Sequence, residues 1–526
     1  MAWEFWVDRG GTFTDIVAQD PVGHLHSHKL LSENPEQYID AAVQGISNIL
    51  GDIQISQADI GAVKMGTTVA TNALLERKGA AVLLMITEGF GDLLEIGYQT
   101  RPELFAMHIQ RPELLYQSVV EVSERLSAEG QVLTPLDMVK ARNSMKLARA
   151  AGVQSIAIAL LHAYVNPRHE QQLASLAKEI GFDQISTSHE VSGLAKLVGR
   201  GDTTVVDAYL SPILRRYVDQ VADALNVGGN CKALMFMQSN GGLTDAQKFQ
   251  GKDSILSGPA GGIVGMAQTG QQAGFDRLIG FDMGGTSTDV SHFAGKFERS
   301  FETEVAGVRM RAPMMDIHTV AAGGGSVCSY RDGRFQVGPE SAGADPGPAS
   351  YRRSGPLTVT DCNLLLGALS ADYFPAVFGV SGNMPLDLDA ARSKAEELSS
   401  QNGLQGTLEE MAQGFLEIAV QNMANAIKKI SVERGHDITT YTLQSFGGAG
   451  GQHACLVAEA LGMSRVMVHP FAGVLSAYGM GLADVRCLRE GQLDCDLDDE
   501  GQVQATLDSL QMAVTHELAT QGIACP

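Results

Sequence analysis

Two stretches of the chain share one order of apolar and polar residues around a pair of glycines. In the first, the apolar run from Trp3 to Val7 enters a Gly-Gly turn, a threonine-rich segment leaves it, and a second turn follows at Asp20 to Gly23. The second stretch repeats this order, with an apolar run from Leu278 to Phe281 and a second turn at Ala294 to Lys296. Short apolar runs bounded by turn residues predict strands. The pattern therefore predicts a three-stranded meander at both places.

The rest of the chain alternates between helical and strand patterns. Spacing of apolar residues predicts helices over Pro35 to Leu50, Val69 to Lys78 and Gln413 to Val432, and buried strands over Val63 to Met65, Ala81 to Ile86 and Ile156 to Leu161. The segment from Glu340 to Pro356 is rich in Gly, Pro, Ala and Ser, which excludes a regular helix or a central strand. It is either a linker or a rigid loop near a cleft.

Composition restricts the class of protein. With 526 residues, 44% of them hydrophobic, the chain should form more than one domain. Its net charge of −22 and the lack of clustered Lys and Arg argue against nucleic acid or anionic lipid as a partner. Its seven cysteines include no Cys-x-x-Cys pair, and we expect a reducing, cytoplasmic compartment. No apolar stretch reaches the ~20 residues that span a membrane.

Three histidines, His24, His26 and His28, alternate along one predicted strand. Their period of two places them on one face, where they could chelate a metal. The simpler interpretation, which we favour, is the solvated face of an edge strand beside a turn.

Both glycine turns carry the pattern Asp-x-Gly-Gly-Thr-x-Thr-Asp, as Asp8 to Asp15 and as Asp282 to Asp289. Glycines there allow positive φ and a close approach to a ligand, and backbone amides and threonine hydroxyls can donate to phosphate oxygens. The leading aspartates, Asp8 and Asp282, would be tolerated beside phosphate if a hydrated Mg²⁺ neutralised them. One copy alone could be a tight hairpin whose Asp and Thr satisfy turn amides. Two matching copies favour a pair of loops that clamp a nucleotide.

A third glycine cluster, Ser445 to His453, follows a short apolar stretch and opens an alanine-rich helix from Ala454 to Leu461. Such a loop directs backbone amides and a helix dipole outward. It is similar to an adenosine-binding loop. No Walker-type Gly-Lys-Ser/Thr and no Rossmann fingerprint at a first βα turn occur in the sequence.

Together these loops resemble the actin, sugar-kinase and Hsp70 ATPase superfold, and specifically its hydantoinase A/oxoprolinase family. Further segments resemble that family, namely Gly66 to Gly79, Thr87 to Phe105, Met237 to Leu243, Ser257 to Gly262, Gly323 to Ser326 and Val337 to Arg353. The resemblance implies an α/β protein of two actin-like (ribonuclease H-like) lobes, each with a mixed sheet that begins in the meander, and a nucleotide cleft between them. We expect an N-terminal lobe over residues 1–195, a second lobe over 196–487 and an incomplete C-terminal region over 488–526. The segments from residue 201 onward, which precede the second meander, are assigned to the second lobe.

The resemblance also implies the site. Asp8 and Asp282 are the candidate catalytic and Mg²⁺-binding residues, and ATP would be bound by Gly10, Gly11, Thr12, Thr14, Asp15, Gly284, Gly285, Thr286, Ser287, Thr288, Asp289, Gly447, Gly448, Gly450 and Gly451. Either aspartate could instead act as a general base. Candidate substrate residues are Thr67, Thr68, Asn72 and Arg101. The first three could simply cap a helix, and Arg101 could precede a helix that starts at Pro102.

By resemblance, the expected activity is ATP-dependent ring opening of a cyclic amide of the 5-oxoproline or hydantoin type, with phosphorylation of the ring carbonyl in this chain. A hydantoinase B-type subunit or fused domain would be the partner, in an oligomer, because no Ser/His/Asp, Cys/His or metal-hydrolase spacing is present to activate water. The alternatives are a subunit of an ATP-dependent ketone carboxylase and a non-enzymatic ATPase-fold regulator.

Overall fold

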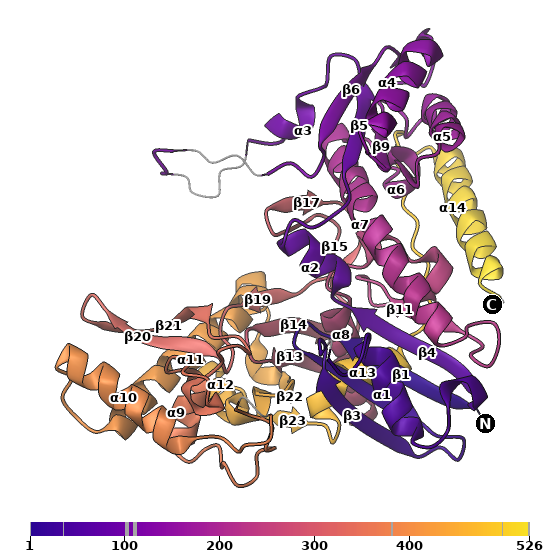
Figure 1. The fold of residues 1–526 in the computed structure, drawn as a ribbon. Coiled ribbons are helices and arrows are strands. Elements are labelled where there is room, and N and C mark those ends of the chain that lie inside the picture. Colours follow the sequence, from indigo (N-terminus) through magenta and orange to yellow (C-terminus); the bar gives the residue numbers. More distant parts are fainter. Residues whose placement is uncertain are drawn as a thin grey trace.

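The computed structural model describes residues 2–34, 36–99, 105–108, 113–379, 382–496 and 498–523, and within these its larger sheets are three in number (Figure 1). The first has the order β12-β11-β4-β1-β2-β3. Its strands are β1 (Trp3–Arg9), β2 (Phe13–Gln19), β3 (Leu25–Leu31), β4 (Ile60–Thr67), β11 (Leu234–Met237) and β12 (Leu243–Asp245). β1, β2 and β3 are antiparallel neighbours, which confirms the first predicted meander.

Strand β1 is buried on both faces. Phe5 and Val7 pack in one core cluster with helix α1 (Ala41–Leu50), and Trp6 faces helix α13 (Leu475–Leu482) on the other side. The helix predicted from Pro35 begins only at Ala41, because the Asp40 side chain accepts the Val43 amide 3.0 Å away and caps it there.

His26 and His28 lie on the edge strand β3, as predicted. His24 and His26 contact the Asp20 carboxylate at 3.3 and 3.2 Å. The Nε2 atom of His28 instead contacts the Asn48 amide at 3.0 Å. His24 and His26 thus share one carboxylate, whereas His28 has a different partner, and the strand that carries His26 and His28 is an edge of the sheet.

The second sheet has the order β19-β14-β13-β22-β23. Its strands are β13 (Arg277–Met283), β14 (Thr288–Ala294), β19 (His318–Val320), β22 (Thr442–Phe446) and β23 (Val466–Val468). The prediction that a third strand follows directly after Lys296 is wrong. An excursion containing β15 (Arg299–Ser300), β16 (Thr303–Val305), β17 (Val308–Met310) and β18 (Met314–Met315) intervenes, and β19 then pairs with β14.

The third sheet is parallel throughout and has the order β10-β9-β5-β6. Its strands are β5 (Val82–Thr87), β6 (Ser118–Val122), β9 (Ser155–Ala159) and β10 (Gln184–Thr187), with helices α4 (Met138–Ala150) and α5 (Arg168–Ile180). The long helix α7 (Leu197–Ala224) links this part, at the top of Figure 1, to the first sheet below it.

The lobe boundary at residue 195 stays a prediction. Strands from the two sides of residue 195 pair in the first sheet. Strand β11 was assigned by sequence to the second lobe, yet it pairs in parallel with β4 of the first sheet, with Leu234 beside Val63. Helix α7 is shared in the same way, because Tyr217 and Val218 belong to the core of the first sheet. Pairing between residues so distant in sequence leaves no local signal.

Helices α8 (Ser257–Gln272) and α13 cross between the first two sheets at very short range. Any side chain on Gly479 would clash with the backbone of Gly261 and Gly265, and a Cβ on Gly265 would lie 2.8 Å from the carbonyl oxygen of Leu475. These glycines therefore let the two helices approach closely.

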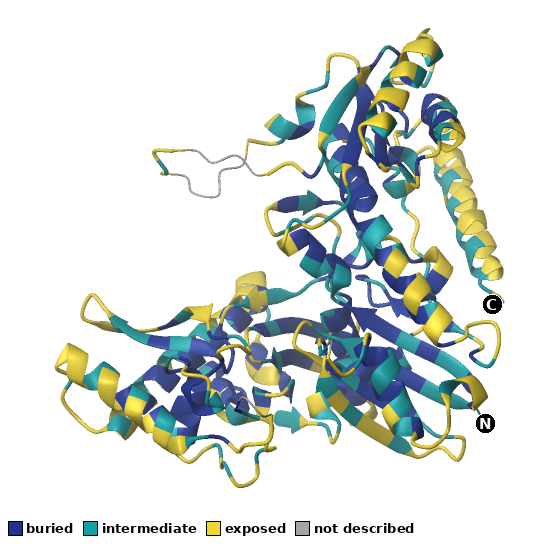
Figure 2. Ribbon diagram, viewed as in Figure 1, coloured by how far each residue is buried: buried dark blue, intermediate teal, exposed yellow. Residues whose placement is uncertain are grey.

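Helices α11 (Leu408–Ile430) and α12 (Ala454–Leu461) lie on the outer face of the second sheet, and helices α9 (Val359–Leu365) and α10 (Leu388–Asn402) pack against α11. The apolar stripe of α11, including Phe415, Ala419 and Met423, is buried against it, which confirms the predicted core helix (Figure 2). The remaining elements are α2 (Val69–Leu75), α3 (Leu93–Ile96), α6 (Ser188–Val191), α14 (Glu500–Thr520), β7 (Arg125–Leu126), β8 (Val132–Thr134), β20 (Ser326–Arg331) and β21 (Arg334–Ser341).

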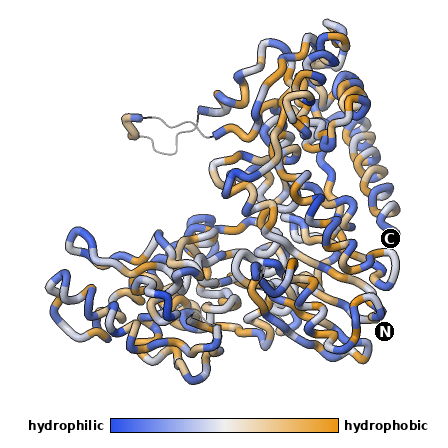
Figure 3. Tube along the Cα trace, viewed as in Figure 1, coloured by the Kyte–Doolittle hydropathy of each residue, from blue (hydrophilic) through white to orange (hydrophobic). Residues whose placement is uncertain are grey.

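Hydrophobic and hydrophilic stretches are mixed along the whole trace (Figure 3). In the part of the chain that the structure describes, no helix combines the length and the apolar character needed to cross a membrane.

Candidate active site

The two repeated motifs form loops of the same geometry, which we call loop 1 (residues 8–15) and loop 2 (residues 282–289). The amide of Gly10 donates to the carbonyl of Phe13 at 3.1 Å, and that of Gly284 donates to the carbonyl of Ser287 at 3.0 Å. The strand register places Asp8 opposite Asp15 and Asp282 opposite Asp289. The sequence repeat is thus also a structural repeat.

The glycines of loops 1 and 2 do not have the predicted positive φ. What they supply is space. A Cβ on Gly10 would lie 2.8 Å from the carbonyl oxygen of Phe13, whereas a Cβ on Gly11 or on Gly285 would meet no described atom within 4 Å. The exposed edges of both loops therefore leave room for a ligand beside backbone amides.

Two of the four threonines brace the loops instead of facing a ligand. Ser32 donates its hydroxyl hydrogen to the carbonyl of Gly10, so the buried Thr14 hydroxyl, 3.0 Å away, must donate to Ser32 Oγ. The buried Thr288 hydroxyl donates to the carbonyl of Ala322. Because each hydroxyl has one hydrogen, neither can donate to phosphate as predicted. The exposed Thr12 and Thr286 remain free to do so.

Four carboxylates meet where the loops converge. Burial and the nearby Asp15 raise the pKa of Asp8 to about 7. Burial, then the charges of Asp289 and Asp8, raise the pKa of Asp282 well above its ordinary value. Asp15 is paired with the Lys29 ammonium group at 2.5 Å, and Asp289 accepts the Thr319 hydroxyl at 2.6 Å. Among the residues that the structure describes, neither leading aspartate has a side-chain partner of the kind that its strand neighbour has.

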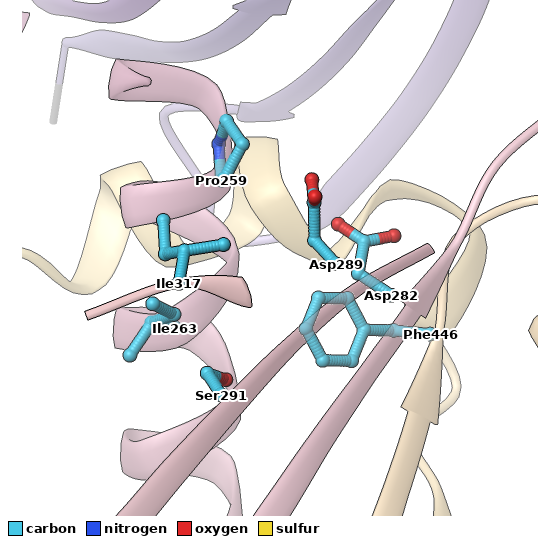
Figure 4. Close-up of a pocket in the computed structure, with 7 residues that line it drawn as sticks. All are labelled: Pro259, Ile263, Asp282, Asp289, Ser291, Ile317 and Phe446. Carbon is cyan, nitrogen blue, oxygen red and sulfur yellow. The ribbon is translucent and has the colours of Figure 1, made fainter. Parts of the chain in front are cut away.

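This donor set fits a hard divalent cation. The Oδ1 atom of Asp8 is buried and has no hydrogen-bond partner among the described residues. Carboxylate oxygens are the ligands that Mg²⁺ prefers, and a cation would offset the repulsion between Asp8 and Asp282. A small pocket lined by Asp282, Asp289 and Phe446, among others, has a volume of about 10 Å³, on the order of one water molecule (Figure 4).

The start of helix α8 lies between the two aspartates, a feature that the sequence analysis missed. A Cβ on Gly258 would be 2.8 Å from Asp8 Oδ1, and one on Gly262 would be 3.6 Å from Asp282 Oδ2. Residues four apart share one face of a helix. The spacing of glycines in Ser-Gly-Pro-Ala-Gly-Gly could have indicated this face, but Gly and Pro normally indicate a turn.

The third glycine loop, loop 3 (Gly447 to His453), contacts loop 2 directly. The Ala449 amide donates to the carbonyl of Met283 at 2.9 Å. Gly447 has φ of +81°, and any Cβ there would clash with Asp282. Gly448, Gly450 and Gly451 do not have positive φ. A Cβ on Gly448 or on Gly451 would meet no described atom within 4 Å, and one on Gly450 would lie 2.7 Å from Ser445 Oγ.

Loop 2 is supported from behind by the segment Gly323 to Ser326, which we call the GGGS loop. The amide of Gly324 donates to the carbonyl of Gly284 at 3.2 Å, and that of Gly325 donates to the carbonyl of Gly285 at 2.6 Å. The Gly/Pro-rich segment is not a free linker, because Ala342 donates in turn to the carbonyl of Gly325 at 2.8 Å.

The candidate substrate residues at the end of β4 serve mainly local structure. The buried Thr67 hydroxyl accepts the amide of Val69 at 3.2 Å at the start of α2, and the Thr68 hydroxyl donates to the carbonyl of Arg9 at 3.3 Å. Asn72 lies on α2 and is partly exposed. Arg101 lies outside the described residues.

One other group of side chains resembles a metal site in composition. His292, Glu298 and His436 each place a ligand atom within 4.8 Å of the others. The two imidazoles are stacked, with ring centroids 4.1 Å and planes 23° apart. A metal lies in the plane of each imidazole that binds it, so stacked rings cannot both point to one ion. Both nitrogens of His292 also have partners, Glu298 at 2.6 Å and Tyr441 at 2.9 Å. We assign no metal here.

Two matching Asp-Gly-Gly loops on two mixed sheets, with crossed helices between them, define a protein of the actin-like ATPase fold. Within that fold, the chain belongs to the hydantoinase/oxoprolinase family. The Hydantoinase/oxoprolinase family model matches residues 200–489, and the model of the Hydantoinase/oxoprolinase N-terminal region matches residues 4–181. The family predicted from the motifs is therefore confirmed.

Named relatives support this family assignment. The chain is 43% identical to 5-oxoprolinase 1 of Arabidopsis thaliana, over 91% of this chain and 41% of the relative, and 33% identical to caprolactamase subunit alpha of Pseudomonas jessenii, over 94% and 72%. The crystal structure of the ATP-dependent caprolactamase from Pseudomonas jessenii superposes with a TM-score of 0.85 at 31% identity, covering 98% of this chain and 76% of that one. The chain thus spans less than half the length of the 5-oxoprolinase.

Proposed function

We propose that this chain binds Mg-ATP between loops 1 and 2 and transfers the γ-phosphoryl group to the carbonyl oxygen of a cyclic amide, as one part of an ATP-dependent ring-opening hydrolase of the 5-oxoproline or hydantoin type. The observation that carries the proposal is the convergence of Asp8 and Asp282 from two equivalent glycine loops, where the buried Oδ1 atom of Asp8 has no hydrogen-bond partner among the described residues. Similarity to 5-oxoprolinases and to a caprolactamase supports a cyclic amide as substrate.

Phosphorylation solves a chemical problem of such substrates. Resonance protects the amide carbonyl from water. Transfer of the γ-phosphoryl group to the carbonyl oxygen releases ADP and gives an imidate-like phosphate, whose ring carbon water can attack. Breaking the ring C–N bond then opens the ring and leaves an acyl phosphate. A second water attacks its carbonyl carbon, and inorganic phosphate leaves with the former carbonyl oxygen.

The chain contributes mainly position and charge to this transfer. We assign to the amides at Gly11 and Gly285 the binding of phosphate oxygens, and to Asp8 and Asp282 the holding of a hydrated Mg²⁺. The ion would supply neutralisation of the charge on the phosphates. The first turn of α8, at Gly258, adds the positive end of a helix dipole beside Asp8. Loop 3, which contacts Asp282 through Gly447, is assigned to adenosine.

We propose further that ring opening requires a second polypeptide or a further region of the same chain. Among the described residues around the loops, we find no group placed to activate water other than the aspartates assigned to Mg²⁺. The name caprolactamase subunit alpha indicates that this relative works with another subunit. A hydantoinase B-type subunit or region is the partner that we expect. We also propose that the protein works as an oligomer and in the cytoplasm.

An oxygen-transfer experiment tests the proposal. The chain, completed by its hydantoinase B-type partner, is incubated with ATP, Mg²⁺ and 5-oxoproline or a hydantoin labelled with ¹⁸O in the ring carbonyl, with and without bicarbonate. We expect ADP formation that depends on the cyclic amide, no requirement for bicarbonate, and ¹⁸O in the released phosphate. Unlabelled phosphate, or turnover only with bicarbonate and a ketone, would contradict the proposal.

A further inference from the structure

Helix α9 touches both of the loops that bracket the nucleotide site from the second sheet. Its side chains Thr360 and Asn363 are three residues apart, so they project from one face of the helix. Thr360 contacts the GGGS loop, which supports loop 2, and Asn363 contacts the end of loop 3. No motif in the sequence drew attention to this helix.

The contact with the GGGS loop is double. The backbone amide and the hydroxyl of Thr360 both donate to the carbonyl of Gly324, each at 2.8 Å. A Cβ on Gly324 would lie 2.8 Å from the Thr360 hydroxyl and 3.8 Å from the Ala449 Cβ of loop 3. Gly324 therefore lies at the point where the GGGS loop, α9 and loop 3 meet.

The contact with loop 3 is also double. The Asn363 amide nitrogen donates to Gln452 Oε1 at 2.8 Å and to His453 Nε2 at 3.1 Å. Asn363 and His453 are both buried. Because His453 Nε2 accepts this hydrogen bond, the proton of the neutral ring resides on Nδ1. Burial lowers the pKa of His453 to about 4, so the ring is neutral at physiological pH.

The helix itself is fixed in place. Thr358 and Asp361 form a capping box at its start, and the buried Asp361 carboxylate also accepts the amides of Ala349 and Ser350 at 3.0 and 2.9 Å. Four donors to one carboxylate hold α9 against the Gly/Pro-rich segment. Because α9 is held in place and is hydrogen-bonded to both the GGGS loop and loop 3, it can fix the distance between these loops.

We propose that α9 sets the spacing between loop 2 and loop 3, with Asn363 as the positioning residue for the adenosine side of the nucleotide and Thr360 as the positioning residue for its phosphate side. The inference rests on the proposed nucleotide site and adds how loop 2 and loop 3 are kept at a fixed distance from each other. Neither residue is assigned a contact with the reacting atoms.

The two roles differ in which part of the nucleotide should be affected. In an Asn363→Leu variant, loop 3 loses both bonds, so affinity for Mg-ATP and for adenosine should fall by a common factor of roughly tenfold. In Thr360→Val, the backbone bond to Gly324 remains while the hydroxyl bond is lost. Affinity for Mg-ATP and Mg-ADP should then fall by a few-fold, with adenosine binding unchanged. Titration calorimetry with the three ligands measures these ratios.

A matched control separates positioning from general loosening of the helix. Cys362→Ala removes a buried side chain from α9 that faces Cys328, with 3.8 Å between the sulfur atoms, and Cys328 belongs to neither loop. We expect wild-type affinities in this variant even if its thermal midpoint falls. If Cys362→Ala and Asn363→Leu have equal thermal midpoints and lose nucleotide affinity equally, the inference is overturned.

The Asn363→Asp variant supplies a spectroscopic signature. A carboxylate can accept a hydrogen bond from Nε2–H of His453 and from a turned Gln452 amide, so it should restore much of the affinity lost in Asn363→Leu. The added negative charge should also raise the pKa of His453 from its low wild-type value, as followed by NMR of ¹³C-labelled histidine. A His453 titration and nucleotide affinities that are the same in wild type, Asn363→Leu and Asn363→Asp would refute the role of Asn363. Absence of any nucleotide binding by the wild-type chain would instead refute the proposed function, and this inference with it.

Discussion

Replacing Asp8 by asparagine tests whether the Asp8 carboxylate destabilises the metal-free protein and serves to bind a cation. The Asp8 side chain is partly buried, its Oδ1 atom has no hydrogen-bond partner among the described residues, and Asp15 lies opposite it on β2. Asparagine has nearly the same shape without the charge. We therefore expect Asp8→Asn to stabilise the metal-free protein while it lowers the affinity for Mg-ATP.

The magnitude follows from the pKa of Asp8, which rises from 3.8 to about 7 on folding. At about 1.4 kcal/mol per unit, the shift corresponds to an upper bound of ~4 kcal/mol. Solvent reaches this partly exposed side chain and screens its charge, so we expect a gain of about 1–2 kcal/mol in the free energy of unfolding. Because the folded pKa is raised, the favourable contribution of protonated Asp8 is complete below about pH 4 and is lost as the pH rises through about 7.

Urea unfolding of both proteins at about pH 4.5 and pH 8, without divalent cations, measures the effect. The advantage of Asp8→Asn should be small at the lower pH and full at the higher pH. Saturating Mg-ATP should stabilise the wild type more and reverse the ranking. An Asp8→Asn protein that is less stable than wild type at pH 8 without Mg²⁺, or that gains as much from Mg-ATP, would refute the reasoning.

Further predictions concern the other loops and the activity. Asp282→Asn should lower ATP turnover by at least ~100-fold without lowering the thermal midpoint, and unchanged ATP hydrolysis in the folded variant would contradict the assignment. Gly447→Val should weaken nucleotide binding, measured by calorimetry, far more than the matched Gly448→Val, because only Gly447 combines positive φ with a clash against Asp282; the opposite order would show that loop 3 is placed differently. Gly258→Ala should displace Asp8 and lower kcat, with little change in kcat if α8 does not position that carboxylate. The purified chain alone should form no glutamate from 5-oxoproline by mass spectrometry, and efficient conversion without a co-purified partner would show that it is complete.

The sequence predicts those parts of the site that depend on local residue order. Loops 1 and 2 follow from the repeated motif, because the apolar runs, the glycine pair and the second turn are all neighbours in the chain. Helix α12 begins and ends where its pattern indicates, at Ala454 and Leu461. The core stripe of α11 is likewise a local periodicity that its burial confirms.

Features that depend on partners distant in the chain could not be predicted. Strand β11 joins the first sheet through β4, about 170 residues earlier, and β19 completes the second meander only after an excursion. The Gly/Pro sequence at the start of α8 has low helix propensity, and its helix is stabilised by packing against α13. The hydroxyls of Thr14 and Thr288 were predicted to face phosphate, but Ser32 and the carbonyl of Ala322 approach them from other segments.

Positional isotope exchange tests the central claim, that this chain itself transfers the γ-phosphoryl group of ATP to a ring carbonyl. ATP labelled with ¹⁸O at the β,γ-bridge is incubated with the purified chain and Mg²⁺, with and without 5-oxoproline or a hydantoin, and recovered ATP is analysed by ³¹P NMR. Reversible transfer frees the β-phosphate to rotate, so the account predicts label in the non-bridging β positions that depends on the cyclic amide and disappears in Asp282→Asn. Retention of the label in the bridge with every cyclic amide, while the wild-type chain binds Mg-ATP, would contradict it.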